Sequence, residues 1–225
     1  MEQDRANGAP VLAIDTSGQQ TGIALYDGRL LSTRSWPAAR TQTTSLLAEI
    51  HHLLDSARLD IEDVAAIGVA TGPGPFTGLR VGVSLAKGFH LATGAPLLGV
   101  STLEAAALPF ATCGRPIVAV VNAGRGRLVW AWYEPESDFL RETRPPRNGE
   151  IADLIAELAI VPEVVVTGEL DDAQIEQIAQ QTEVEVPAAT VRVRQPAAVA
   201  ELTWRRWQRG EHDDATALEP VYLSR

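Results

Sequence analysis

The chain has 225 residues, of which 45% are hydrophobic and 21% charged, and its formal net charge is −10. This length allows one large domain or two small ones, and the acidic balance argues against a protein that holds a nucleic-acid backbone by itself. The single cysteine, Cys113, excludes a disulfide framework within the chain. The polar segment 1–10 does not resemble a signal peptide, and no run approaches the roughly 20 apolar residues of a membrane span. We therefore expect a cytoplasmic protein without membrane contact.

The first half of the sequence predicts strands and helices in alternation. Residues 11–14 form a continuous apolar run, which is typical of a strand buried on both faces, and a polar turn follows it. Thr77 is a candidate N-cap for the helix after a Gly/Pro loop at 71–76. The expected strands are 11–14, 22–26, 29–36, 64–70 and 96–100, and the expected helices are 41–57, 77–92 and 101–108.

The second half repeats this order of elements. The expected strands are 117–121, 128–133, 139–143 and 164–167, and the expected helices are 151–158, 173–180 and 197–208. Each half thus reads strand–strand–strand–helix–strand–helix. Two short matches, Ile14-Asp15 with Val121-Asn122 and Val69-Ala70-Thr71-Gly72 with Val165-Val166-Thr167-Gly168, indicate an internal duplication, with chance similarity as the alternative.

This pattern predicts an α/β protein with two RNase H-like lobes, at 1–110 and 111–225. Two such lobes facing a cleft form the actin, Hsp70 and sugar-kinase (ASKHA) architecture. A likeness of fold does not establish an activity.

The turn Asp15-Thr16-Ser17 is a candidate phosphate-binding element. In ATPases of this architecture such a turn offers N–H groups and hydroxyls to phosphate, and the acid holds a metal ion. A turn whose Asp and Ser side chains satisfy local backbone groups is the alternative, and the spacing alone favours it.

The loop at 72–78 leads into a helix N-terminus, which is a natural anion site. Its glycines allow positive φ and its prolines stiffen the chain, but no Gly-Lys-Ser/Thr follows, so it is not a P-loop. Gly72 and Gly74 join the Asp15 turn as candidate nucleotide-binding residues, and a rigid strand-to-helix connector is the alternative.

The helix after this loop contains three glycines, Gly78, Gly82 and Gly88. Each glycine inside a helix costs about 1 kcal/mol relative to alanine, so a compensating contact is expected. Close approach of another helix would supply it, either within the lobe or across a protein interface, and the sequence leaves both open.

No catalytic residue and no metal ligand set is predicted. The histidines, His51, His52, His90 and His212, include no pair spaced for metal ligation. No Gly-x-Ser-x-Gly nucleophile elbow is present either.

Several motifs together resemble the bacterial TsaB (YeaZ) family. They are Ile14-Asp15-Thr16-Ser17, the run from Gly72 through Gly-Pro-Phe-Thr-Gly-Leu-Arg to Gly82, Leu98-Gly99-Val100-Ser101-Thr102-Leu103 and the Pro220-Val221-Tyr222-Leu223 tail. The match is strong over the first half of the chain and looser over the second.

The resemblance implies a role in making N6-threonylcarbamoyladenosine at position 37 of tRNAs that read ANN codons. In that family a paralogue, TsaD, performs the transfer, while the TsaB-like subunit pairs with TsaD as a scaffold and a small ATPase, TsaE, joins them. The resemblance further implies a homodimer when the subunit is alone, and tRNA contact only through the complex. No tightly bound cofactor is expected. The alternative is that ATP or ADP binds with Mg at the partner interface.

The resemblance also indicates which residues carry these roles. In the TsaD paralogue, the segment matching 100–106 has two histidines that hold a metal ion, where this chain has Thr102 and Ala106. These cannot replace imidazole ligands, so no catalysis by the chain alone is expected. The expected partner and dimer interface lies on the first-lobe helices and comprises Thr43, Leu47, Gly78, Leu79, Val81, Gly82, Leu85 and Phe89.

Two other functions compete with this one. An independent actin-like ATPase or small-molecule kinase would use Asp15 and the duplicated lobes. A metallopeptidase, an old label in this superfamily, lacks support because neither a metal pair nor a nucleophile–base constellation is visible.

Overall fold

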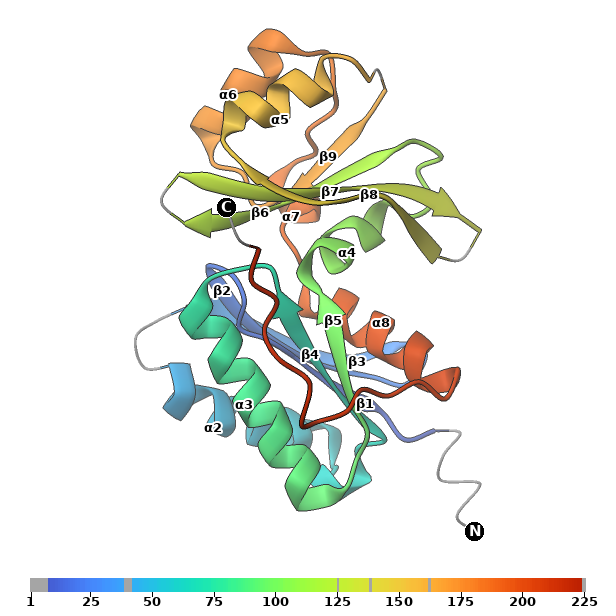
Figure 1. Ribbon diagram of the computed structural model, residues 1–225. Helices are drawn as coiled ribbons and strands as arrows, with labels where there is room; N and C mark the ends of the chain where they lie inside the picture. The colour runs from blue at the N-terminus through green and yellow to red at the C-terminus, as the bar shows by residue number, and fades with distance from the viewer. Residues whose placement is uncertain (1–7, 39–41, 125, 138, 162, 224–225) are drawn as a thin grey trace. The chain divides into compact units, whose positions relative to one another are not determined.

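The computed structural model describes residues 8–38, 42–124, 126–137, 139–161 and 163–223, without the side chains of residues 42–44. The chain divides into two compact units (Figure 1). Unit 1 comprises Met1–Gly72, Phe76–Ser101 and Gln195–Val221, and unit 2 comprises Pro73–Pro75, Thr102–Arg194 and Tyr222–Arg225.

Unit 1 is built on a sheet with the strand order β3-β2-β1-β4-β5 among the described residues. Its elements are β1 (Val11–Asp15), β2 (Gln20–Tyr26), β3 (Leu30–Pro37), α2 (Gln42–Ala57), η1 (Ile61–Asp63), β4 (Ala66–Gly72), α3 (Phe76–Thr93) and β5 (Leu97–Ser101), with α8 (Pro196–Gln208). The first three strands are antiparallel neighbours, and β1, β4 and β5 run parallel.

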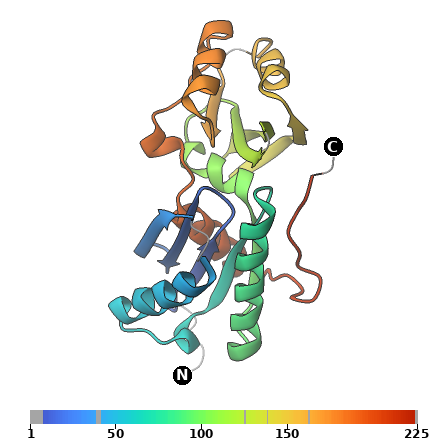
Figure 2. The ribbon, with the colours of Figure 1, turned by 90° about the vertical axis from the view of Figure 1, so that its left-hand side faces the viewer.

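Helices cover both faces of this sheet (Figures 1 and 2). On β1, Leu12 and Ile14 pack into the core cluster shared with α2 and α3, whereas Val11 packs on the opposite side with Trp204 of α8. Successive side chains of a strand point to opposite faces. A continuous apolar run is therefore what a strand covered on both sides requires.

Unit 2 has a sheet of order β8-β7-β6-β9 among its described residues. Its elements are α4 (Thr102–Ala107), η2 (Leu108–Phe110), β6 (Ile117–Gly124), β7 (Arg127–Glu136), β8 (Phe139–Gly149), α5 (Ile151–Leu158), β9 (Val165–Gly168), α6 (Asp172–Gln181) and α7 (Ala189–Arg192). Leu154, Leu158 and Ile178 of α5 and α6 pack in one core cluster with Val118 and Val120 of β6.

The predicted duplication is present in the topology. Each unit has an antiparallel three-stranded meander, a helix, a strand parallel to the first strand, and a further helix. The paired motifs also match in conformation, because Gly72 ends β4 at φ +114° and Gly168 ends β9 at φ +105°. The place of β5 is taken in unit 2 by a single bridge, in which Val166 N donates to Glu185 O at 2.8 Å.

The predicted lobe boundaries need a correction. The chain leaves unit 1 after Ser101, close to the expected residue 110, but the segment Gln195–Val221 returns to unit 1 instead of belonging to the second lobe. The reason is the apolar face of the first sheet opposite α2 and α3, which α8 covers. Contact there is close, because a Cβ at Gly68 of β4 would collide with Thr203 of α8.

Element types were otherwise predicted well, and one strand bound differs for a physical reason. The strand expected at 139–143 continues to Gly149 through Pro145 and Pro146. It lies at the end of the sheet order, and an edge strand tolerates prolines because its outer N–H groups have no ladder to join. The short α7 was not expected.

Candidate functional site

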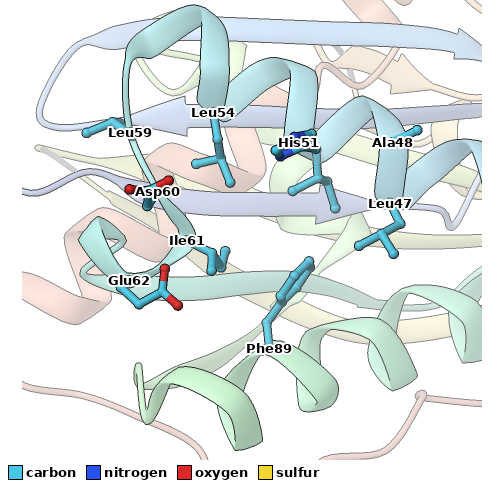
Figure 3. A pocket seen from close by; sticks show the side chains of 10 residues that line it. Leu47, Ala48, His51, Leu54, Leu59, Asp60, Ile61, Glu62 and Phe89 are labelled. Atoms are coloured by element: carbon cyan, nitrogen blue, oxygen red, sulfur yellow. The ribbon is translucent and has the colours of Figure 1, made fainter.

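Two grooves lie along helices α2 and α3 of unit 1, and Figure 3 shows the first of them. The first, which we call the α2 groove, has a volume of about 600 Å³ and is lined by Leu47, Ala48, Ile50, His51, Leu54, Leu59, Asp60, Ile61, Glu62 and Phe89. The second, the α3 groove, has a volume of about 630 Å³ and is lined by Phe76, Thr77, Arg80, Val81, Ser84 and Leu85.

The α2 groove is apolar along its length and acidic at one end. Figure 3 shows Phe89 of α3 reaching toward α2, with Leu47 at one end of the groove and Asp60 and Glu62 at the other. The amphipathic α2 turns Leu46, Ile50 and Leu53 into the core, so the groove is formed by residues at the edge of its buried face.

Large apolar side chains are exposed on the same two helices. Leu47 is 52% exposed, Phe76 51% and Leu91 82%. The guanidinium of Arg80 lies 3.8 Å from the ring centre of Phe76, over its face. Leu47 and Phe76 line the two grooves, and apolar surface of this kind is typical of an interaction site.

Gly88 belongs to this surface and differs from the other glycines of α3. A Cβ at Gly88 would meet no described atom within 4 Å. The helix therefore carries the cost of a glycine there without an internal contact that requires one. The bare backbone at this position would allow another helix to approach closely.

The expected interface residues are brought together only in part. Leu47 and Phe89 line the α2 groove, and Val81 and Leu85 line the α3 groove. The side chain of Thr43 lies outside the described residues.

The remaining three interface residues, Gly78, Leu79 and Gly82, are buried within unit 1. A Cβ at Gly78 would collide with the backbone oxygen of Thr16, and one at Gly82 with the Thr16 hydroxyl. Internal packing against the β1–β2 turn, and not a partner, is what requires these two glycines. Their assignment to an interface is corrected accordingly.

In the expected phosphate-binding turn, the side chains form hydrogen bonds within unit 1. Asp15, Thr16 and Ser17 are all buried, and Asp15 Oδ1 accepts hydrogen bonds from Ser17 N at 2.9 Å and Ser17 Oγ at 2.5 Å. Thr16 Oγ1 donates to Gly78 O at 2.6 Å. The turn thus holds the first turn of α3 against β1, as in the structural alternative.

The two loop glycines have different surroundings. Gly72 has φ +114°, where a Cβ would also crowd Val221 O, so this position needs glycine for its conformation. Gly74 is half-buried in the following loop.

The positions where the TsaD paralogue is expected to carry metal-binding histidines are used for packing here. Thr102 is 0% exposed and donates its hydroxyl to Pro73 O at 2.6 Å, and Ala106 is 1% exposed. Among the described residues, no group of three His, Cys, Asp or Glu side chains is placed to hold a metal ion.

No helix in the described part of the chain is both long enough and apolar enough to cross a membrane.

Of the residues that line the α2 groove, the sequence predicted Leu47 and Phe89 alone. The stretch Leu59–Glu62, between an expected helix and an expected strand, carried no prediction, although its apolar residues alternate with acids. No local pattern shows that η1 would lie beside α2 and Phe89, because that proximity depends on how β4 enters the sheet.

Comparison with known proteins identifies the family. A sequence model of the TsaD family, described as tRNA N6-adenosine threonylcarbamoyltransferase, matches residues 37–203. Two relatives named tRNA threonylcarbamoyladenosine biosynthesis protein TsaB match as well, at 28% identity in Escherichia coli and 31% in Bacillus subtilis. The chain belongs to the TsaB (YeaZ) family.

The matches to these TsaB relatives are partial in length. They cover 57% and 64% of this chain, and the chain spans 56% and 63% of the two relatives. The solved YeaZ structure from Pseudomonas aeruginosa is similar over 96% of this chain and all of that chain, with 25% identity and a TM-score of 0.76. Solved structures of lower identity share the fold alone, which is the actin-like ASKHA fold expected from the sequence.

Proposed function

We propose that this chain is a non-catalytic subunit that binds and supports a TsaD-like catalytic subunit in the biosynthesis of threonylcarbamoyladenosine in tRNA. The observation that carries the proposal is the surface of α2 and α3, where two apolar grooves and Gly88 lie on one side of unit 1. Family membership supplies the pathway, since the TsaB relatives are named for that biosynthesis.

The buried Thr102 and Ala106 support the non-catalytic part of the proposal. A histidine at either position would need space that the packed unit does not offer, and overpacking of this kind is destabilising. The transfer reaction then belongs to the partner.

The resemblance to the TsaB family extends the proposal to the assembly around the subunit. A TsaE-like ATPase joins the pair, the chain self-associates through the α2 and α3 surface when the partner is absent, and tRNA is contacted only through the complex. The complex works in the cytoplasm. ATP or ADP with Mg belongs to the partner interface, because the side chains of the Asp15 turn are already engaged inside unit 1.

The test is size-exclusion chromatography with light scattering, on the chain alone and mixed with the TsaD-like protein of the same genome. A one-to-one complex is expected. Gly88→Leu should weaken it by at least tenfold, because the new side chain would stand where the partner approaches most closely.

Gly88→Leu is a cleaner probe than a change at Gly82, which would disturb the fold. Removing a helix glycine at a position without neighbours should raise the stability of the chain by about 1 kcal/mol, so loss of binding would not reflect unfolding. Ala179→Leu, at an exposed position of α6 in unit 2, is the matched control and should bind normally. A Gly88→Leu variant that binds as tightly as the control would refute the use of this surface.

An independent actin-like ATPase is the competing function. It predicts Mg-dependent nucleotide turnover by the chain alone that disappears in Asp15→Ala. Such turnover would replace the scaffold proposal, and a rate equal to the buffer background would remove the competitor.

A further inference from the structure

We propose that the α2 groove receives a large apolar side chain from a helix of the partner, and that Asp60 and Glu62 select a lysine or arginine beside that side chain. This inference rests on the proposed function and adds the chemistry that the partner must present. The occupant is therefore an amphipathic helix with an aliphatic or aromatic anchor and a basic residue within one turn of it.

The walls of the groove fit an apolar anchor. Leu54 from the core side, Leu59 and Ile61 from the turn before β4, and Phe89 from α3 surround a volume of about 600 Å³. Figure 3 shows Leu54, Ile61 and Phe89 pointing into the space between α2 and α3. Burial of one large apolar side chain in a preformed pocket of this kind stabilises a complex, and interface anchors act in this way.

The acidic end gives the groove its selectivity. Asp60 and Glu62 are exposed, and neither forms an ion pair with any side chain in the described part of the chain. The nearby His51 does not neutralise them, because its Nε2 lies 3.6 Å from Asp55. A basic residue of the partner would form ion pairs with these two carboxylates, and an acidic residue would be repelled by them.

The turn that carries the two acids is held in place. Asp63 Oδ2 accepts a hydrogen bond from Asp60 N at 3.0 Å, and Val64 N donates to Ile61 O at 3.2 Å. The carboxylates of Asp60 and Glu62 therefore extend from a fixed turn, which limits the ordering cost when a cation binds.

A helix suits the groove better than a compact ligand because the apolar surface continues along α3. Phe89 lines the α2 groove, and Leu85, one turn earlier, lines the α3 groove. A partner helix could thus place its anchor beside Phe89 and continue past Leu85 and the bare backbone of Gly88. This is the helix-in-groove mode of recognition.

The test measures association of the full chain with the TsaD-like protein by surface plasmon resonance at low and high salt. Ala48→Phe fills the groove from an exposed position of α2 and should weaken binding by at least tenfold, mainly by faster dissociation. Asp60→Lys/Glu62→Lys should slow association by about tenfold at low salt and flatten its salt dependence, because steering by the carboxylates is lost.

Matched controls lie on α6 of unit 2, where Ala179→Phe and the double variant Asp172→Lys/Glu176→Lys make the same changes at exposed positions. They should bind like the unchanged chain. Circular dichroism should show that every variant is folded, with a small loss of stability in the double lysine variant, because Asp60 is the N-cap of η1. Binding of Ala48→Phe and of the double lysine variant within twofold of the controls would overturn this inference and leave the scaffold function standing.

Two further outcomes also decide the matter. If the unchanged chain does not bind the TsaD-like protein, the proposed function fails and the inference falls with it. If Ala48→Phe abolishes self-association while partner binding persists, the groove takes a second copy of this chain, and the inference is overturned.

Discussion

At the residue scale, Thr16 is the contact point for the first turns of α3. Its hydroxyl donates to Gly78 O, and the absence of a side chain at Gly78 and Gly82 lets the helix lie directly on the turn. Two glycines in one helix have a cost, and here close packing of helix on turn offsets it.

We predict opposite effects for alanine at two glycines of the same helix. Gly78→Ala should lower the free energy of unfolding by about 2 kcal/mol or more, because the new Cβ would meet the backbone oxygen of Thr16, which cannot move aside as a side chain can. Gly88→Ala, with open space around it, should raise it by up to about 1 kcal/mol. Urea unfolding followed by circular dichroism measures both, and equal effects would contradict this account of the glycines.

At the element scale, the C-terminal segment covers the outer edge of β5. Gly99 N donates to Asp213 Oδ2 at 2.7 Å, Arg206 Nη1 donates to Gly99 O at 2.5 Å, and Asp213 N donates to Leu97 O at 2.8 Å. An uncovered edge strand invites pairing with other chains. The segment thus completes the first sheet in place of a further strand.

Arg206 anchors this segment, and its removal should be costly. Arg206→Met should destabilise unit 1 by about 1–3 kcal/mol, because Gly99 O loses its donor and the ion pairs with Glu211 and Asp213 are broken. Arg205→Met is the matched control on the next residue. It removes a half-buried pair with Glu201 on the same helix and should cost less than Arg206→Met, about 0.5–1 kcal/mol. Equal melting temperatures for the two variants would show that the edge contact contributes nothing.

The same anchor predicts a dependence on pH. Hydrogen bonds from Arg206 and Arg209 lower the pKa of Glu211. Because the pKa is lower in the folded state, the stabilisation is present above the ordinary glutamate value of about 4.3 and is lost as the pH falls through the folded value. Hydrogen exchange at the Gly99 amide should therefore lose protection below about pH 4 in the unchanged chain. Arg206→Met should show a smaller loss, because Arg209 still holds the Glu211 carboxylate.

At the scale of the whole molecule, the two units are versions of one pattern with different additions. Unit 1 has β5, α8 and the segment after α8 up to Val221 in addition to the shared pattern. Among the described residues of unit 2, a bridge at Glu185 lies where β5 would be. The partner surface proposed here belongs to the larger unit.

A chain that ends at Arg194 tests this division. It keeps both sheets but loses α8, which would uncover Val11, Ala66 and Leu98 on the first sheet. We expect the shortened chain to aggregate or to bind a hydrophobic dye strongly, because a large exposed apolar face is not tolerated in solution. A soluble shortened chain with native melting would show that the first sheet does not need α8 to cover it.

Much of the fold could be predicted because the type of each predicted element depends on the pattern of neighbouring residues. The continuous apolar run at 11–14 indicated a doubly covered strand, and the repeat of the meander indicated two related units. Four of the expected interface residues, Leu47, Val81, Leu85 and Phe89, lie in the grooves. The resemblance to the family indicated them, and in the structure they are apolar residues at the margins of amphipathic helices.

The sequence by itself determined the kind of most elements, the duplication and the family. Only the tertiary structure decided that Gly78 and Gly82 face Thr16, that α8 returns to the first sheet, and that Asp60 and Glu62 lie at the end of the α2 groove. The reason is the range of the interactions involved. Periodicity and capping act over a few residues, whereas Thr16 and Gly78 are 62 positions apart and meet only after the sheet has formed.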